Sequence, residues 1–207
     1  TSSENLLRVD DRGNTQFDID ALRSRLDDLP KETLSAPEQE SLLFTREEEK
    51  LARDVYQQLD AVWGLNPLHN IADSEETHME AVLLLLDRYE LSDPASGQPV
   101  GTFTNTDLQA LNDSLVAVGE TSAVDALKVG AAIEEIDILD LEEALNTVVD
   151  NQDITLIYEN LLKGSRNHLR AFVRSLEAQG ITYTPQYLSA SAYEDIINNP
   201  METGPMP

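Results

Sequence analysis

The sequence predicts an all-α protein, organised as a four-helix bundle with one long crossover between the second and third helices. Four stretches repeat apolar residues with the period of an α-helix, at 35–63, 66–89, 122–149 and from 150 or 151 to just before 180. No stretch longer than a few residues alternates with a period of two, so we expect no β-sheet. The three connections are about 2, 32 and 2–3 residues long, and such short links make the helices of each pair antiparallel neighbours.

Helix-boundary signals support the first pair of helices. Ser35 and Glu38 have the spacing of a capping box, in which each side chain satisfies a backbone amide at the start of a helix. Gly64 interrupts the helical period and is expected to end this helix. Asn66 and Pro67 follow directly, and proline is favoured in the first turn of a helix. The second helix therefore begins here.

The crossover and the second pair carry their own boundary signals. Residues 92–101, with the sequence SDPASGQPVG, are a loop by composition. Thr104 and Asp107 are expected to cap a short helix within the crossover. Ser122 and Asp125 repeat the same spacing and are expected to cap the third long helix.

The chain is expected to divide into three parts around one domain. Residues 1–34 form a polar N-terminal extension with a short helix near 17–29. Residues 35–180 form the four-helix bundle. Residues 181–207 are a proline-containing C-terminal tail, with one more short helix expected around 190–198. A length of 207 residues is ample for a domain with a full core.

The charge balance restricts the classes of partner. Thirty-nine acidic residues face fourteen basic ones, which gives a net charge of −25. Such a field repels nucleic acids and anionic lipids and favours metal ions or basic partners. No apolar run approaches the roughly 20 residues that a membrane-spanning helix needs. We therefore expect no nucleic-acid binding and no membrane span, and the sequence leaves open whether identical chains form a homo-oligomer.

Two further features bear on cofactors and location. The chain contains no cysteine, which excludes disulfides, cysteine-based zinc sites, iron–sulfur clusters and thiol nucleophiles. The first residue is threonine, as expected for an exported protein from which a signal peptide has been removed. On this ground we expect an extracellular or periplasmic protein, with a cytoplasmic location as the alternative.

Each long helix carries polar side chains near its midpoint, on the face that is otherwise apolar. They are Glu48 in the first helix, Glu75 and His78 in the second, Glu134 and Asp137 in the third, and Ser165 and His168 in the fourth. Unpaired buried carboxylates cost several kcal/mol each, so their convergence predicts a cation among them. Carboxylate oxygens together with imidazole nitrogens suit iron, manganese or zinc. Glu75 and His78 are adjacent on their helix and form the clearest half of such a site.

Four motifs in order carry a resemblance to a known family. They are EEEKLARDVY at 47–56, NIADSEETHMEAV at 70–82, IEEIDILDL at 133–141 and GSRNHLRAF at 164–172. Over roughly residues 36–188 the chain resembles the ferritin-like di-iron carboxylate superfamily, to which rubrerythrin and bacterioferritin belong. Within it, the chain is similar to the branch known as domain of unknown function 2202. The resemblance implies a metal pair held by one Glu from each of two helices and a Glu-x-x-His motif from each of the other two.

The chain departs from this pattern in two places. Ser165 stands where the second Glu-x-x-His motif has its glutamate, three residues before His168, and Asp137 is the candidate replacement. On the first helix, the apolar face favours Glu48 as ligand, whereas the superfamily spacing Glu-x-x-Ala-x-x-x-Tyr fits Glu49. We choose Glu48 as the ligand because of its burial, with Glu49 as the close alternative, and one or two ions are compatible with the residues present.

The resemblance implies a ferritin-like metal protein that binds iron, with manganese or zinc as alternatives. It also implies oxidase, ferroxidase or peroxide-reducing chemistry, so a di-iron oxidoreductase is the expected enzyme class, with no catalytic residue assigned. The alternative is a metal-free secreted structural or assembly module on a ferritin-like scaffold. Carboxylates of Glu75 and Glu134 turned toward solvent would favour the module, and buried ones would favour the metal protein.

Overall fold

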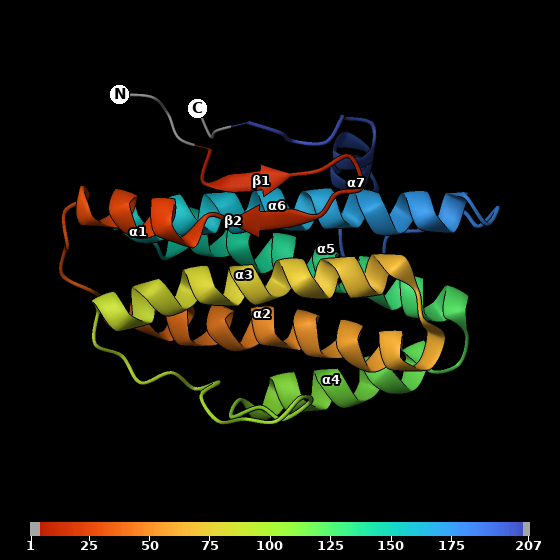
Figure 1. Ribbon diagram of the computed structural model, residues 1–207, viewed down its shortest axis with the longest axis horizontal. Helices are drawn as coiled ribbons and strands as arrows, with labels where there is room; N and C mark the ends of the chain where they lie inside the picture. Colours follow the sequence, from red (N-terminus) through yellow and green to blue (C-terminus); the bar gives the residue numbers. More distant parts are fainter. Residues whose placement is uncertain (1–4, 205–207) are drawn as a thin grey trace.

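Four long helices dominate the computed structural model, which describes residues 5–204. They are α2 (Ala36–Trp63), α3 (Asn66–Arg88), α5 (Ala123–Thr147) and α6 (Gln152–Glu177). All four run along the long axis of the molecule, with α2 packed mainly on α3 and α5 mainly on α6 (Figure 1). The prediction of a mainly helical protein with four long helices at these positions is confirmed.

Shorter elements surround the long helices. They are the strands β1 (Leu7–Val9) and β2 (Thr15–Phe17) and the helices α1 (Ile19–Asp27), α4 (Thr106–Gly119) and α7 (Ala190–Ile197). Helix α4 lies in the crossover and packs on α2 and α5, while α7 packs on α6. The three short helices therefore lie where the sequence predicts them, within two residues at most ends.

The two strands correct the expectation that the chain has no sheet. They form an antiparallel hairpin, with Leu7 opposite Phe17 and Val9 opposite Thr15. Strands of three residues are too short to show a period of two, which is why the sequence pattern does not reveal them. Strand β2 contacts both α3 and α6, so the hairpin lies over the junction of these two helices (Figure 1).

The helix ends follow the predicted capping chemistry with one exception. Ser35 and Glu38 form the complete capping box of α2, and Gly64 ends that helix in the left-handed region at φ 61°. The Ser122 side chain caps α5 as expected. The cap of α4 is Asn105 rather than Thr104, because the Asn105 side chain accepts two amide hydrogen bonds.

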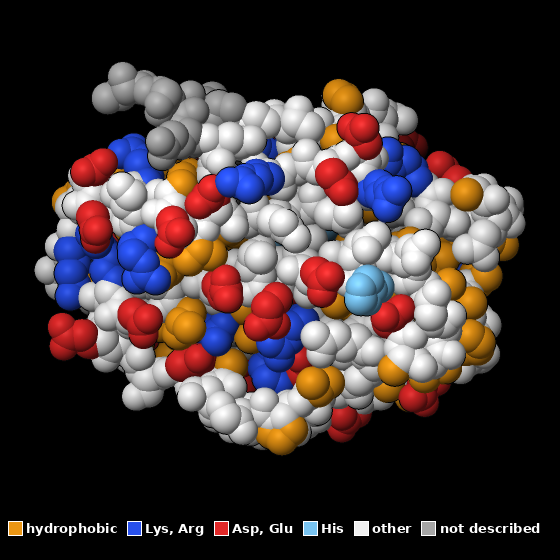
Figure 2. Space-filling model, in the orientation of Figure 1, with side chains coloured by type: hydrophobic (Ala, Val, Ile, Leu, Met, Phe, Trp, Pro, Cys, Tyr) orange, Lys and Arg blue, Asp and Glu red, His pale blue; other side chains and the backbone are white. Residues whose placement is uncertain are grey.

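The acidic composition is visible on the surface as scattered Asp and Glu side chains (Figure 2). In the face seen in Figure 2, Asp and Glu side chains are spread among polar, apolar and basic ones. Within residues 5–204, no helix has the length and apolar character needed to cross a membrane. This agrees with the absence of a long apolar run in the sequence.

The core consists of two apolar clusters separated by a polar layer. One cluster contains Leu59, Ile71 and Phe172, toward one end of the long helices. The other contains Leu85 and Tyr158, with residues of the hairpin and of α1, toward the other end. Between them, at the midpoints of the long helices, the buried side chains are charged or polar. All four long helices contribute side chains to this layer.

Candidate metal centre

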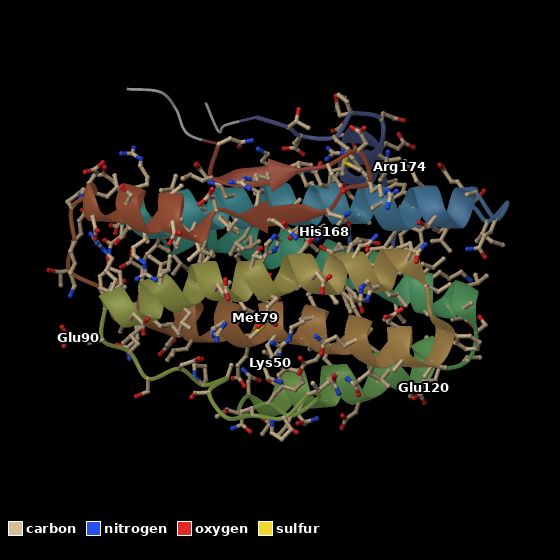
Figure 3. The ribbon with its side chains drawn as sticks, viewed as in Figure 1. Lys50, Met79, Glu90, Glu120, His168 and Arg174 are labelled. Carbon is tan, nitrogen blue, oxygen red and sulfur yellow. The ribbon has the colours of Figure 1, made fainter. Side chains whose placement is uncertain are left out.

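The polar layer contains every acidic and histidine residue that the sequence places on the core faces. Glu48, Glu49, Glu75, His78, Glu134, Asp137 and His168 all have relative exposures of 3% or less. His168 lies in the interior between α6 and α3 (Figure 3). Charged groups this deeply buried are tolerated only when they are paired or neutralised.

Glu75 lies between the two imidazoles. One carboxylate oxygen of Glu75, Oε2, is 2.9 Å from Nδ1 of His78. The other, Oε1, is 2.8 Å from Nδ1 of His168. The two rings are nearly parallel, with an interplanar angle of 16° and centroids 5.2 Å apart. One carboxylate on α3 thus faces one histidine on its own helix and one on α6.

A second glutamate faces each imidazole from a neighbouring helix. Oε2 of Glu49 on α2 is 3.3 Å from Nδ1 of His78. Oε2 of Glu134 on α5 is 3.5 Å from Nδ1 of His168. The layer therefore has a first half, made of His78 and Glu49, and a second half, made of His168 and Glu134, with Glu75 shared between them.

Tyr56 fixes the carboxylate of the second half. Its hydroxyl donates a hydrogen bond of 2.6 Å to Oε1 of Glu134. The tyrosine side chain is fully buried, and burial together with nearby Glu134 and Glu75 raises its pKa well above the ordinary value. Tyr56 therefore stays a neutral donor, which leaves Oε2 of Glu134 facing the imidazole.

The Nε2 atoms of both imidazoles meet a residue from outside the long helices. Thr15, on β2, places its hydroxyl oxygen 2.8 Å from Nε2 of His78 and 2.8 Å from Nε2 of His168. Gly164 on α6 makes this approach feasible, because a Cβ atom there would lie 2.6 Å from the His78 ring. Helix α6 is α-helical without interruption through Gly164.

Both imidazoles have pKa values well above the ordinary value for histidine. Burial lowers the pKa of His78, but the adjacent Glu75 and Glu49 outweigh it and raise the value to about 10. Burial likewise opposes protonation of His168, and Glu75 with Glu134 raises its pKa to about 9. The same contacts hold the pKa of Glu75 below its usual range against the effect of burial. Without a bound cation, both rings are therefore imidazolium ions at neutral pH.

A further acidic group lies beside the histidine cluster. Burial and the adjacent Asp140 raise the pKa of Glu48 well above its usual value. Burial and the nearby Glu48 do the same for Asp137. Neither residue contacts an imidazole, and no positive side chain of the described residues pairs with them. Without a cation, both carboxyl groups are therefore held toward their protonated, neutral form.

The carboxylates of the polar layer differ from other buried carboxylates in how completely they are hydrogen-bonded. Glu38 accepts from the amides of Asp150 and Asn151 at the start of α6, and Glu135 accepts from four groups between residues 183 and 188. These carboxylates stabilise the backbone. Within the described residues, four buried side-chain atoms have no hydrogen-bond partner, namely Glu48 Oε1, Glu75 Oε1, Glu134 Oε2 and His168 Nδ1. All four belong to the polar layer.

The donor set fits a metal ion on chemical grounds. One ligand atom from each of Glu75, His78 and His168 lies within 4.8 Å of the other two. Carboxylate oxygen and imidazole nitrogen are the donors that iron, manganese and zinc take in proteins. Groups that lack partners in the absence of a cation would gain one when it binds.

Residues 38–200 match the family described as an uncharacterized protein domain, DUF2202. The chain belongs to this family. It is 53% identical, over 176 residues, to the uncharacterized protein MJ0754 of Methanocaldococcus jannaschii, an overlap of 85% of this chain and 95% of that protein. A crystal structure of MJ0754, described as a hypothetical protein, aligns with a TM-score of 0.81 over 84% of this chain and 99% of that one.

The DUF2202 match includes all of the residues that the sequence singles out for a metal centre. The structure brings five of them into one contact network, namely Glu49, Glu75, His78, Glu134 and His168. Glu48 and Asp137 lie in the same layer but contact neither histidine. Ser165 is buried, and its hydroxyl donates to the Leu161 carbonyl within α6. On the first helix, Glu49 rather than Glu48 reaches an imidazole.

The sequence pattern did not reveal that Thr15, which lies outside the DUF2202 match, contacts both imidazoles. It also did not reveal that Gly164 makes room for the His78 ring or that Asp140 raises the pKa of Glu48. Thr15 belongs to a polar segment with no helical period, so no pattern relates it to residues about 60 or 150 positions away. Gly164 could have been found by one signal, since a glycine in a helix interior is unfavourable and often reports a close approach. That approach is to the His78 ring.

Proposed function

We propose that this DUF2202 protein is a ferritin-like metal protein that binds iron in the polar layer, with manganese or zinc as alternative ions. Helices α2, α3, α5 and α6 form the four-helix bundle, and the long crossover between α3 and α5 carries α4. The packing of α2 on α3 and of α5 on α6 supports this topology.

The observation that carries the proposal is the position of Glu75. Its two oxygens face Nδ1 of two different histidines at 2.9 and 2.8 Å, in a layer sealed from solvent. Oε1 of Glu75 and Nδ1 of His168 approach this closely without forming a hydrogen bond. The ion pair of this carboxylate and this imidazole therefore lacks the hydrogen bond that usually accompanies it, which supports a metal ion as a further partner of both groups.

The two halves of the layer support a pair of ions. The first half offers His78, Glu49 and one oxygen of Glu75. The second half offers His168, Glu134 and the other oxygen of Glu75. Burial and neighbouring acids raise the pKa values of Glu48 and Asp137, and cationic charge in the layer would lower them again and so favour the carboxylate forms.

Bound iron would supply electrons for reduction of dioxygen or peroxide, the oxidase, ferroxidase or peroxide-reducing chemistry of the superfamily that the chain resembles. The protein contributes binding, orientation and the exclusion of water. Tyr56 holds Glu134 by its hydroxyl, and the two apolar clusters keep solvent away on both sides. Binding displaces a proton from Nδ1 of each imidazole, because only the neutral ring is a ligand.

Metal analysis of variants tests this function. Wild-type protein is loaded with ferrous iron without oxygen, freed of unbound ions and analysed for iron per chain. We expect about two ions per chain in wild type, and near-complete loss in a His78→Ala, His168→Ala double variant. His69→Ala is the matched control, because His69 is the third histidine and its side chain is 65% exposed. The control keeps the full iron content.

Two results of the metal analysis would overturn the proposal. A folded wild-type protein that retains no iron, manganese or zinc would favour the metal-free structural or assembly module instead. A double variant that retains as much iron as the His69→Ala control would place the ions elsewhere. Absorption after exposure to air supplies a second readout, since ferric iron in the layer absorbs in the near ultraviolet and the control retains this absorption.

A further inference from the structure

Thr15 occupies a position that the proposed function does not require. It is fully buried, belongs to the N-terminal hairpin and places one hydroxyl between two imidazole rings. Its oxygen is 2.8 Å from Nε2 of His78 and 2.8 Å from Nε2 of His168. Both distances are those of ordinary hydrogen bonds. One side chain thus contacts the outer edge of both rings.

The chemistry of a hydroxyl limits how these contacts are made. A threonine oxygen has two lone pairs and can accept two hydrogen bonds, but it can donate only one. If Thr15 donated to either ring, that ring would carry its proton on Nδ1 when neutral. Nδ1 could then not bind an ion. If Thr15 accepts from both rings, each Nε2 carries a proton and each Nδ1 remains available to the carboxylates.

Hydrogen bonds and packing of the hairpin hold Thr15 against α3 and α6. The Thr15 amide donates to Oγ of Ser74 at 3.0 Å, and the Phe17 amide donates to Oγ1 of Thr77 at 3.1 Å. The Phe17 ring meets His78 edge-on, with centroids 5.5 Å apart. At the turn, Gly13 has φ +91°, and a Cβ atom there would lie 2.8 Å from the Asn167 carbonyl oxygen. The turn therefore packs directly on the backbone of α6.

We propose that Thr15 is a positioning residue of the metal centre, whose hydroxyl oxygen accepts a hydrogen bond from Nε2 of both His78 and His168 and so turns both Nδ1 atoms toward the carboxylates. The metal part of this inference rests on the proposed function. The orientation of the two rings does not depend on that function, because Thr15 makes the same hydrogen bonds in the metal-free protein. The hairpin is then a component of the site although it precedes the part of the chain that matches the DUF2202 family.

The ring protons give a direct test. The chain has only three histidines, so His78→Ala and His168→Ala assign each ring in long-range proton–nitrogen NMR spectra. In wild type we expect a slowly exchanging proton on Nε2 of both rings, in the metal-free form and in the form loaded with diamagnetic zinc. Absence of an Nε2 proton on either ring in the zinc-loaded form overturns the proposal, even if no Thr15 variant folds.

Three variants separate the hydroxyl from packing. Thr15→Val keeps the shape but removes the acceptor, and we expect altered or rapidly exchanging Nε2 protons and roughly 10- to 100-fold weaker zinc binding. Thr15→Ser keeps the hydroxyl and restores both readouts. Gln16→Val is the matched control, because Gln16 is the next residue of β2 and points to solvent. It leaves both readouts at their wild-type values.

The outcomes distinguish this inference from the proposed function. Wild-type protein that binds no zinc, iron or manganese, but whose Nε2 protons change in Thr15→Val, supports the positioning role and refutes the metal centre. Thr15→Val with unchanged Nε2 protons and zinc affinity within about twofold of wild type refutes the positioning role and leaves the metal centre intact. A change of thermal stability alone, with both readouts unmoved, also refutes it.

Discussion

Glu75 on α3 and His168 on α6 approach to 2.8 Å across the interior, yet no hydrogen bond joins them. In the metal-free protein the contact is therefore mainly one of charge, between a carboxylate and an imidazolium ion. Buried ion pairs gain much of their energy from attraction and lose much of it to desolvation. Removing one partner leaves the other charge uncompensated, so the two residues are expected to be energetically coupled.

Glu75→Gln is expected to destabilise the metal-free protein by about 3–5 kcal/mol, the usual cost of breaking a buried charge pair. The amide is nearly isosteric, but it removes the negative charge that faces both imidazolium rings. Chemical denaturation of the metal-free protein measures the effect. Glu80→Gln is the control, because Glu80 lies on the same helix and is exposed, and its stability should stay within about 0.5 kcal/mol of wild type. Equal losses in the two variants would contradict the prediction.

Tyr56→Phe is expected to weaken metal binding roughly tenfold while the protein stays folded. The change removes the hydrogen bond of 2.6 Å that orients Glu134, and outer partners of this kind tune the affinity of a metal site. Isothermal titration with manganese or zinc measures the affinity.

Tyr158→Phe is the matched control for Tyr56→Phe. Tyr158 is also fully buried, but its hydroxyl contacts Ser41 and Thr45 rather than a carboxylate of the layer. We expect Tyr158→Phe to reduce stability by about 1 kcal/mol and to leave the affinity unchanged. A larger loss of affinity in Tyr158→Phe than in Tyr56→Phe would show that packing, rather than the bond to Glu134, governs binding.

Helical periodicity predicts the long helices well because each buries one stripe of apolar residues, and such a stripe is visible in the sequence. The same reasoning places Glu75, His78, Glu134 and His168 in the interior, since a charged residue at the centre of an apolar stripe has nowhere else to point. The structure buries all four. These elements and residues were predictable because their environment is set by their own helix.

The rest depends on contacts between segments far apart in the chain. Glu48 and Glu49 are adjacent and both buried, so only the position of α3 decides that Glu49 reaches His78. Thr15 meets the rings because two three-residue strands fold over α3 and α6, and its own segment gives no sign of this. Helical periodicity describes one helix at a time, so it does not predict contacts between distant segments.

Stability of the metal-free protein is expected to fall as the pH rises from about 7 to 10. The folded-state pKa values of His78 and His168, about 10 and about 9, exceed the unfolded value of about 6.5. Protonation of these rings therefore contributes stability that is complete below pH 6.5 and is lost as the pH rises through 9 and 10. Glu48 and Asp137 act in the same direction, because the folded protein favours their protonated forms.

Denaturation at several pH values, with and without zinc, measures this dependence. Zinc must displace the Nδ1 protons, so the stabilisation that it gives should increase with pH over the range in which the metal-free protein weakens. The His69→Ala variant should follow wild type, since its ring is exposed. In the His78→Ala, His168→Ala variant the decrease above pH 8 should become shallower. If stability decreased with the same slope in all three proteins, titratable groups other than His78 and His168 would cause the decrease.

Gly164→Ala is expected to weaken metal binding although alanine favours a helix by about 1 kcal/mol over glycine. A methyl group at this position would lie 2.6 Å from Cε1 and 3.0 Å from Nε2 of His78, so the ring must turn or shift. Gly119→Ala is the matched control, because Gly119 is also helical and the three atoms nearest to its methyl group would all belong to the Leu59 side chain in an apolar cluster. Both variants should lose stability, since both crowd the core. Only Gly164→Ala should lose zinc affinity, because only its methyl group reaches an imidazole, and titration of the two variants side by side separates displacement of the ring from general strain.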